Sequence, residues 1–168
     1  MISIEEAERA QARSDHAQIS SCSKSRQWPG ALRLLREVGL RGAVPYQNAY
    51  NVVITACSKG QKWQGAVGLF EEMQRLGVEP GTITYNAVVS ACGKGNQWQG
   101  AVGVLEEMHG RGILPNTISY CTAISACEKM KQWQVALILL EEMQRRGIVA
   151  DTIAYSAAIS ACEKGRQW

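Results

Sequence analysis

Residues Thr82–Asn116 read TITYNAVVSACGKGNQWQGAVGVLEEMHGRGILPN, and the landmarks of this stretch recur along the chain every 35 residues. Trp, Cys, Tyr, one Gly and a Glu-Glu-Met triplet keep this interval: Trp28, Trp63, Trp98, Trp133 and Trp168; Cys22, Cys57, Cys92, Cys127 and Cys162; Tyr50, Tyr85, Tyr120 and Tyr155; Gly42, Gly77, Gly112 and Gly147; Glu71–Met73, Glu106–Met108 and Glu141–Met143. A constant period of about 20 to 50 residues is typical of repeat architectures. The chain of 168 residues is therefore predicted to be a repeat protein.

Each repeat contains two stretches of helical spacing. The first apolar stripe stands at i, i+3, i+4 and i+7 and predicts a first helix: Tyr85, Val88, Val89 and Cys92. The second stripe predicts a second helix: Trp98, Ala101, Val102, Leu105 and Met108.

Glycine and proline separate these helices. Gly95 interrupts the apolar pattern where a tight turn between antiparallel helices is expected. Gly112 is expected to end the second helix in a left-handed cap, with Ile113 making the hydrophobic contact that accompanies such a cap. Pro115 stops continuation, so the next first helix is expected from Thr117. The predicted fold is all-α, a solenoid of stacked helix-turn-helix hairpins whose apolar faces cover one another.

Composition and charge narrow the class of protein. Hydrophobic residues make up 46% of the chain and charged residues 20%, which is enough to bury a core. A net charge of +3 permits an RNA partner without arguing for one. No apolar run approaches the roughly 18 residues needed to span a bilayer, so no membrane segment is expected. Residues 1–15 contain three Glu and no apolar core, so neither a secretory signal nor an organellar transit peptide is predicted there.

The regularly spaced cysteines are predicted to be reduced core residues. Equivalent helices of adjacent hairpins lie about 8–10 Å apart, whereas a disulfide needs Cα atoms within about 7 Å. There is no Cys-x-x-Cys pair, and His16 and His109 fall in no ligand spacing, so no metal site is expected. Redox or metal thiols remain the alternative to core packing. Reduced cysteines fit an intracellular compartment.

The segment Thr82–Asn116 resembles the pentatricopeptide repeat, with its Thr-Tyr-Asn opening, Lys-x-Gly before the turn, Glu-Glu-Met, Gly and Pro. A period of 35 and this opening distinguish it from the tetratricopeptide repeat. The resemblance is close over Gln47–Trp168 and looser over Ala12–Tyr46, and it implies a right-handed superhelix of the P class. The predicted organisation is an N-terminal extension at 1–11, a degenerate repeat at 12–46, repeats at 47–81, 82–116 and 117–151, and a truncated repeat at 152–168. Because the last repeat contains a first helix only, we expect a fragment of a longer array or an incomplete gene model.

A polar flank runs beside the buried stripe of each first helix. At about 100° per residue from Tyr85, Asn86 falls near 100°, Ser90 near 140° and Lys94 near 180°. The flank recurs at Asn51, Thr55 and Lys59; Cys121, Ser125 and Lys129; and Ser156, Ser160 and Lys164. Glu128 and Glu163 stand beside two of the Lys, and the second helices carry the Glu pairs. A solvated face and a nucleic-acid face are equally compatible with this pattern.

The family resemblance favours RNA, because pentatricopeptide repeats read one base per repeat with two or three side chains. It implies three base-reading pairs and one unmatched residue: Asn51 with Gly81, Asn86 with Asn116, Cys121 with Asp151, and Ser156. It also implies base-flanking residues at Ile83, Ile118 and Ile153, with Asn48 departing from the pattern, and phosphate-facing residues at Lys59, Lys94, Lys129 and Lys164. Asn86 with Asn116 resembles a pyrimidine reader with a preference for cytosine. Asn51 keeps a pyrimidine tendency, Cys121 is off the family's pattern, and Ser156 leans towards a purine.

The predicted function is single-stranded RNA binding in the processing, stability, editing or translation of organellar RNA, in mitochondria or plastids by resemblance alone. With three or four bases stacked at roughly 1–3 kcal/mol each, the isolated chain is expected to bind in the micromolar range or weaker. A protein-interaction solenoid and a non-functional fragment are the alternatives. An enzyme is not expected, because the chain lacks the His-x-Glu and Cys-x-x-Cys of a zinc deaminase and any other catalytic cluster; no cofactor is expected either.

Overall fold

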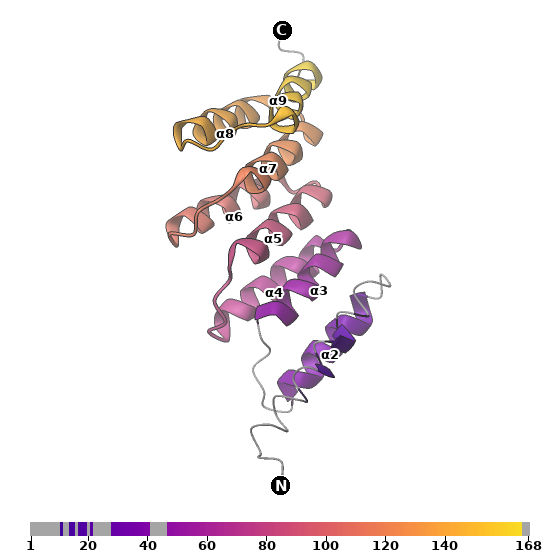
Figure 1. Cartoon of the computed structure of the whole chain (residues 1–168). Coiled ribbons are helices and arrows are strands. Elements are labelled where there is room, and N and C mark those ends of the chain that lie inside the picture. The colour runs from indigo at the N-terminus through magenta and orange to yellow at the C-terminus, as the bar shows by residue number, and fades with distance from the viewer. Residues whose placement is uncertain are drawn as a thin grey trace. The chain divides into compact units, whose positions relative to one another are not determined.

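The computed structural model describes residues 11, 14–15, 17–19, 21, 28–40 and 47–165. These residues form helices joined by turns, with no strand among them (Figure 1). Residues 1–10 of the predicted extension, 16 of the 35 residues of the degenerate repeat, and Trp168 lie outside the described residues. The helices are α2 (Trp28–Leu40), α3 (Gln47–Lys59), α4 (Trp63–Arg75), α5 (Thr82–Lys94), α6 (Trp98–Gly110), α7 (Thr117–Lys129), α8 (Trp133–Arg145) and α9 (Thr152–Lys164).

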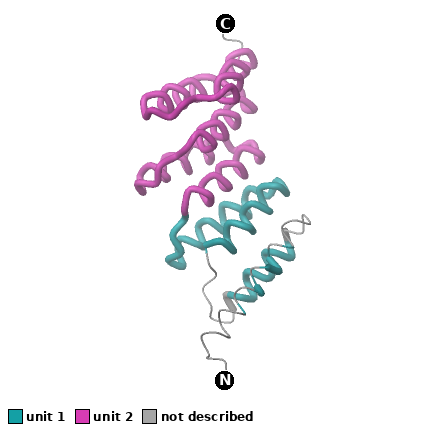
Figure 2. Tube along the Cα trace, viewed as in Figure 1, with its two compact units in different colours: residues 1–80 teal, residues 81–168 magenta. Residues whose placement is uncertain are grey.

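The chain divides into two compact units, Met1–Pro80 and Gly81–Trp168 (Figure 2). In the first unit, α3 packs against both α2 and α4. In the second unit, α5, α7 and α9 pack against one another in sequence, α6 packs against α5 and α7, and α8 packs against α7 and α9 (Figure 1). Among the described residues, the first unit thus contains the hairpin α3–α4 with α2 packed on it, and the second unit stacks the hairpins α5–α6 and α7–α8 and the helix α9 side by side, as the 35-residue period predicts.

The predicted first-helix stripe is the core. Tyr85, Val88 and Val89 are completely buried and Cys92 almost so. In the predicted second-helix stripe, Ala101, Leu105 and Met108 are buried, whereas Trp98 and Val102 are only half-buried because they lie at its margins. Burying an aliphatic or aromatic side chain stabilises a fold by about 1.5–3 kcal/mol, so the repeated stripes supply the main driving force for stacking.

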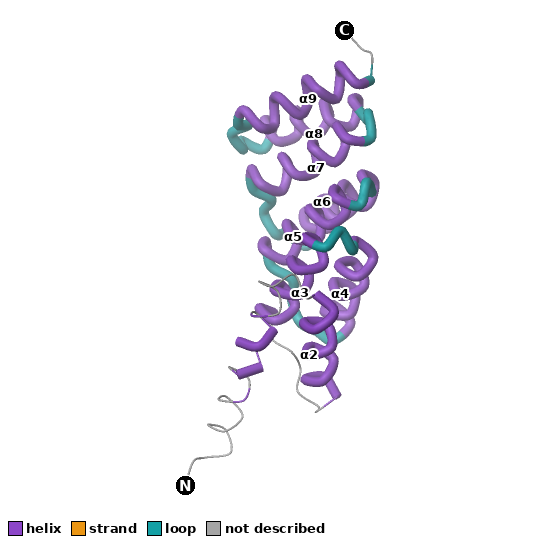
Figure 3. The backbone as a smooth tube through the Cα atoms, turned by 90° about the vertical axis from the view of Figure 1, so that its right-hand side faces the viewer, coloured by secondary structure: helices purple, strands orange, loops and turns teal. Residues whose placement is uncertain are grey.

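The turn between α5 and α6 places its left-handed residue at Asn96, one position after the predicted Gly95. The Gly95 N–H donates to the Ala91 carbonyl at 2.9 Å and its φ is −84°, so Gly95 still closes the last helical turn. Asn96 adopts the left-handed conformation, with φ of 58°, and Gln61 between α3 and α4 and Lys131 between α7 and α8 do the same. Figure 3 draws the turns that join the helices in teal. Asn tolerates the left-handed region better than most residues because its short polar side chain can bond locally.

The turn between hairpins is the cap predicted at Gly112. The φ of Gly112 is 71°, its N–H donates to His109 and the Ile113 N–H donates to Met108. This pair of bonds is the Schellman motif, which satisfies the last carbonyls of the helix. Gly77 and Gly147 make the same two bonds, so one cap recurs in both units.

The regularly spaced cysteines that the structure describes are free thiols. Cys57, Cys92 and Cys127 are buried, and Cys162 is half-buried. Cys22 lies outside the described residues. None of the helices in the described part of the chain is both long and apolar enough to cross a bilayer.

Candidate nucleic-acid interface

The last residue of each of the three complete predicted repeats is the N-cap of the next first helix: Gly81 for α5, Asn116 for α7 and Asp151 for α9. The Asn116 Oδ1 accepts from the Ser119 N–H at 3.1 Å at the start of α7, and the Asp151 Oδ1 accepts from the Ala154 N–H at 2.9 Å at the start of α9. Such bonds satisfy amides that a helix start leaves unpaired. Sequence reasoning missed this role, although an Asn or Asp directly before an apolar helical pattern is its usual signal.

Two of the three predicted base-reading pairs are brought together by this geometry. The Asn86 Nδ2 donates to the Asn116 Oδ1 at 3.4 Å, and the Cys121 Sγ donates to the Asp151 Oδ1 at 3.3 Å. The members of each pair are separated by 30 residues and meet because one first helix stacks on the next.

The remaining predicted readers are placed separately. Asn51 is buried on α3 in the first unit, and Gly81 is the extended N-cap of α5 in the second unit. Ser156 is exposed on α9 and its hydroxyl donates to the Thr152 carbonyl.

The predicted base-flanking isoleucines are exposed apolar side chains. Ile83, Ile118 and Ile153 are 70%, 62% and 60% exposed at the first turns of α5, α7 and α9. A hollow of about 300 Å³ lies between α7 and α9. It is lined by Thr117, Ile118, Cys121, Thr122, Ser125, Asp151 and Ile153, so it contains one predicted pair together with two flanking isoleucines.

The Cys121–Asp151 pair holds its proton on sulfur. Burial, together with the adjacent Asp151 carboxylate, raises the pKa of the Cys121 thiol to about 11. The hydrogen bond from the Ala154 N–H, with that from Cys121, keeps the pKa of Asp151 below its ordinary value. At neutral pH the thiol is thus a donor and the carboxylate an acceptor.

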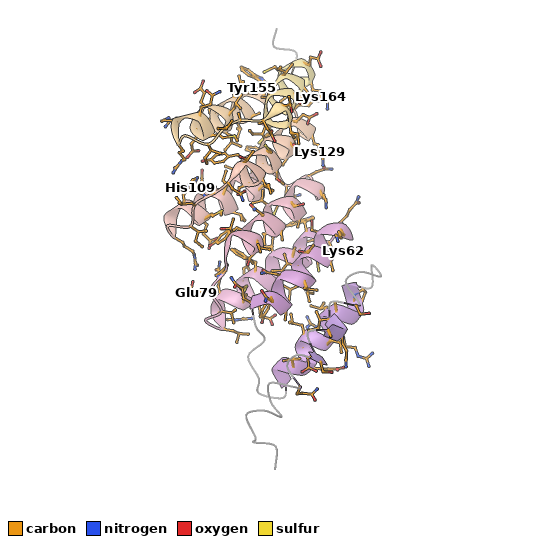
Figure 4. All side chains as sticks on the ribbon, in the orientation of Figure 1. Lys62, Glu79, His109, Lys129, Tyr155 and Lys164 are labelled. Carbon is orange, nitrogen blue, oxygen red and sulfur yellow. The ribbon has the colours of Figure 1, made fainter. Side chains whose placement is uncertain are left out.

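The lysines of the polar flank are exposed, but they do not share one environment. Lys129 and Lys164 lie on one side of the second unit, with His109 on the opposite side (Figure 4). The Lys164 Nζ is 2.7 Å from the Glu128 Oε1, which also accepts from the Ser160 Oγ at 2.8 Å. The Lys129 Nζ donates to the Gly93 carbonyl at 3.5 Å. Lys59 and Lys94 are exposed at the ends of α3 and α5.

The acidic second-helix side is partly neutralised by arginine. Glu107 pairs with Arg111 at 3.0 Å and Glu142 with Arg146 at 2.7 Å. The negative charge of the second-helix side is therefore weaker than the Glu pairs alone imply. Among the residues that the structure describes, no three His, Cys, Asp or Glu side chains are grouped so as to hold a metal ion.

The profile of the PPR repeat family, the pentatricopeptide repeats, matches residues 45–94, 80–129 and 115–164, which together span more than two thirds of the chain. The chain belongs to this family. A comparison with curated protein sequences finds no match.

Solved pentatricopeptide repeat structures share the fold. The repeat protein PPR10, known from maize, in complex with an 18-nt psaJ RNA element is 27% identical with a TM-score of 0.77, over 93% of this chain and 23% of that one. The PPR domain of the Arabidopsis thaliana protein-only RNase P 1 in complex with tRNA is 21% identical with a TM-score of 0.80, over 89% and 79%. The nuclear proteinaceous RNase P 2 of A. thaliana is 19% identical with a TM-score of 0.80, over 92% and 35%.

These likenesses confirm the all-α solenoid of stacked hairpins. The chain spans less than a quarter of the length of PPR10.

Proposed function

We propose that this pentatricopeptide repeat chain binds single-stranded RNA along the flank of its first helices, one base per repeat, with bases at the junctions of α5 with α7 and of α7 with α9 in the second unit. The observation that carries this proposal is the pairing of Asn86 with Asn116 and of Cys121 with Asp151, each at hydrogen-bond distance across a junction. Exposed isoleucines stand at the same junctions, where they offer apolar surface to the faces of a base. Binding of RNA by PPR10 and of tRNA by the RNase P domain supports the assignment.

The proposed activity is recognition and not catalysis, in the processing, stability, editing or translation of RNA in mitochondria or plastids. The phosphate backbone follows the lysines of the flank, with Lys94 and Lys129 as the main contacts of the second unit. Lys164 contributes less because Glu128 neutralises it. Imaging the full gene product as a fluorescent fusion in living cells tests the compartment.

The test of binding is fluorescence anisotropy of the whole chain with labelled C, U and A homopolymer RNAs at low and moderate salt. We expect micromolar or weaker binding that favours pyrimidines and weakens with salt. Asn86→Asp, which replaces an amide donor by a carboxylate, and Lys94→Ala, which removes a cation of the flank, should both weaken it. Arg145→Ala is the matched control, because it removes one positive charge from the second-helix side.

A protein-interaction solenoid is the second candidate. Exposed apolar residues in the loops between hairpins favour it, namely Leu114 and Val149. Absence of RNA binding even at low salt, or equal loss of binding in Lys94→Ala and Arg145→Ala, would reject the proposed interface in favour of this alternative.

A further inference from the structure

The Asn86–Asn116 pair rests on a buried hydroxyl that belongs to neither residue. Ser119, in the first turn of α7, is completely buried. Its Oγ is 2.6 Å from the Asn86 Oδ1 and 3.1 Å from the Asn116 Oδ1, and it accepts from the Asn116 N–H at 3.1 Å. Ser119 therefore contacts both members of the pair.

The orientation of the Asn116 carboxamide is determined by its role as a helix cap. The atom facing the Ser119 N–H must be an acceptor, so it is the oxygen and not the nitrogen. Carboxamide orientation follows from the surrounding hydrogen bonds in this way because the two ends have the same shape.

The cap in turn determines the orientation of Asn86. Its Nδ2 faces the Asn116 Oδ1 at 3.4 Å, and a flipped carboxamide would set two carbonyl oxygens against each other. The Asn86 Oδ1 then points at Ser119. The hydroxyl has one proton to donate, and its closest acceptor is this oxygen at 2.6 Å.

The consequence is that protein donors occupy the oxygens of both carboxamides, so the hydrogen-bonding groups left for a ligand are N–H donors. Cytosine offers two adjacent acceptors, O2 and N3, on its pairing edge. Uracil has an N3–H donor in place of the N3 acceptor. We infer that Ser119 is a specificity-determining positioning residue, which selects cytosine over uracil at this junction by holding the Asn86 oxygen against its hydroxyl. The inference rests on the proposed RNA-binding function and deepens it.

A purely structural role for Ser119 would be to complete the cap of α7, since its Oγ accepts from the Asn116 N–H. The next repeat shows that a first helix can start without a hydroxyl at the position of Ser119. Ala154 occupies the equivalent position in α9, is also completely buried, and leaves the Asp151 cap intact. In that repeat the reading pair is Cys121 with Asp151, and it contains no carboxamide to orient.

The test compares Ser119→Ala with Ser119→Thr in the whole chain. Thr84 shows that a threonine fits the equivalent buried position in α5. The readout is the ratio of affinities for C and U homopolymer RNAs. Because all bases of a homopolymer are identical, the same base lies at this junction wherever the strand binds. Losing one oriented hydrogen bond of about 1 kcal/mol should reduce the preference for C roughly fivefold in Ser119→Ala. Ser119→Thr should restore it.

A second readout separates this inference from the proposed function. In the free chain, the NMR signals of the Asn86 side-chain NH₂ group, assigned by their loss in Asn86→Asp, should shift in Ser119→Ala and return in Ser119→Thr. A C-to-U ratio unchanged in Ser119→Ala would overturn the inference while leaving RNA binding intact. If the wild type binds neither RNA, the proposed function and the base preference both fail, and the NH₂ signals still decide whether Ser119 positions Asn86.

Discussion

Asn116 belongs at once to the fold and to the proposed interface. Its Oδ1 caps α7 through the Ser119 N–H and accepts from Asn86. Truncating such a side chain therefore changes stability and recognition together. Asp151, which caps α9 in the same way, shows that a carboxylate can replace the amide without losing the cap.

The two roles of Asn116 can be separated by substitution. Asn116→Asp keeps an acceptor for the Ser119 N–H, so thermal unfolding should stay near that of the wild type. It replaces the Asn116 NH₂ group by an acceptor oxygen, so the preference should move from C towards U RNA. Asn116→Ala should lose about 1 kcal/mol of stability with the cap. Thermal unfolding followed by circular dichroism and RNA anisotropy check the two effects; an Asn116→Asp chain as unstable as Asn116→Ala would contradict the cap assignment.

At the residue scale, the sequence predicts burial better than it predicts polar contacts. Spacing alone identifies Tyr85, Val88 and Val89 as core, because a helix places i, i+3 and i+4 on one face. Spacing does not show that the left-handed turn residue is Asn96 and not Gly95, since an Asn can adopt that conformation too. It also does not reveal the Ser119 contact, which depends on how two helices stack.

At the scale of elements, first helices are joined by contacts that differ from one junction to the next. Between α7 and α9, Glu128 accepts from both Ser160 and Lys164. Between α5 and α7, the residue equivalent to Glu128 is Gly93. A Cβ added to Gly93 would lie 3.2 Å from the Ala126 Cβ, so the helices approach closely there. The sequence places Glu128 beside Lys129 along the chain, whereas the structure pairs it with Lys164 of the next repeat.

The Glu128–Lys164 contact predicts a pH-dependent stability. Burial by itself raises the pKa of Glu128, but the hydrogen bonds from Lys164 and Ser160 outweigh it and hold that pKa below its ordinary value of 4.5. The ionised form therefore stabilises the fold above about pH 4.5, and this contribution is lost as pH falls through the lowered pKa. Glu128→Gln should lower the unfolding midpoint at neutral pH by an amount equivalent to less than about 1 kcal/mol, because Lys164 is half exposed.

Urea unfolding of Glu128→Gln at several pH values is the measurement. The difference from the wild type should shrink as pH falls below about 4.5. Glu141→Gln, at an exposed position of α8, removes the same charge and serves as the control. A deficit that persists unchanged in acid would show that the Glu128 charge is not its cause. The same substitution releases Lys164 and should strengthen RNA binding at low salt.

At the scale of the whole molecule, the 35-residue period predicts the architecture because each repeat of a solenoid contacts only its neighbours. The predicted helices are found at α3 to α9 for that reason. The 35-residue period does not predict which polar side chains of the candidate interface contact one another. Asn86 and Asn116 are 30 residues apart, and only the family resemblance predicts from the sequence that they form a pair. Neither spacing nor the family resemblance predicts the contact of Lys164 with Glu128, which are 36 residues apart.

Because each repeat of a solenoid is stabilised by its contacts with its neighbours, covering the exposed side of α9 with a further helix should raise the stability of the fold. Tyr155 is 45% exposed and Ile159 63%, whereas their equivalents Tyr120 and Ile124, covered by α8, are completely buried. By the period, Trp168 corresponds to Trp133, so a copy of residues 134–148 appended after Trp168 should form a second helix over α9. Burying two such side chains is worth about 1.5–3 kcal/mol each before the cost of ordering the added residues.

We expect the extended chain to unfold at a temperature several degrees higher, about 2–4 °C for each kcal/mol gained at this chain length. It should also bind less of a hydrophobic dye such as ANS. The control appends the same segment with the copies of Leu139 and Leu140 replaced by Ser, which keeps its length while removing two buried side chains of α8. If both extensions raise the unfolding temperature equally, the gain does not come from covering Tyr155 and Ile159. A gain confined to the apolar extension would show that the exposed face of α9 is a helix-docking surface, as solenoid stacking requires.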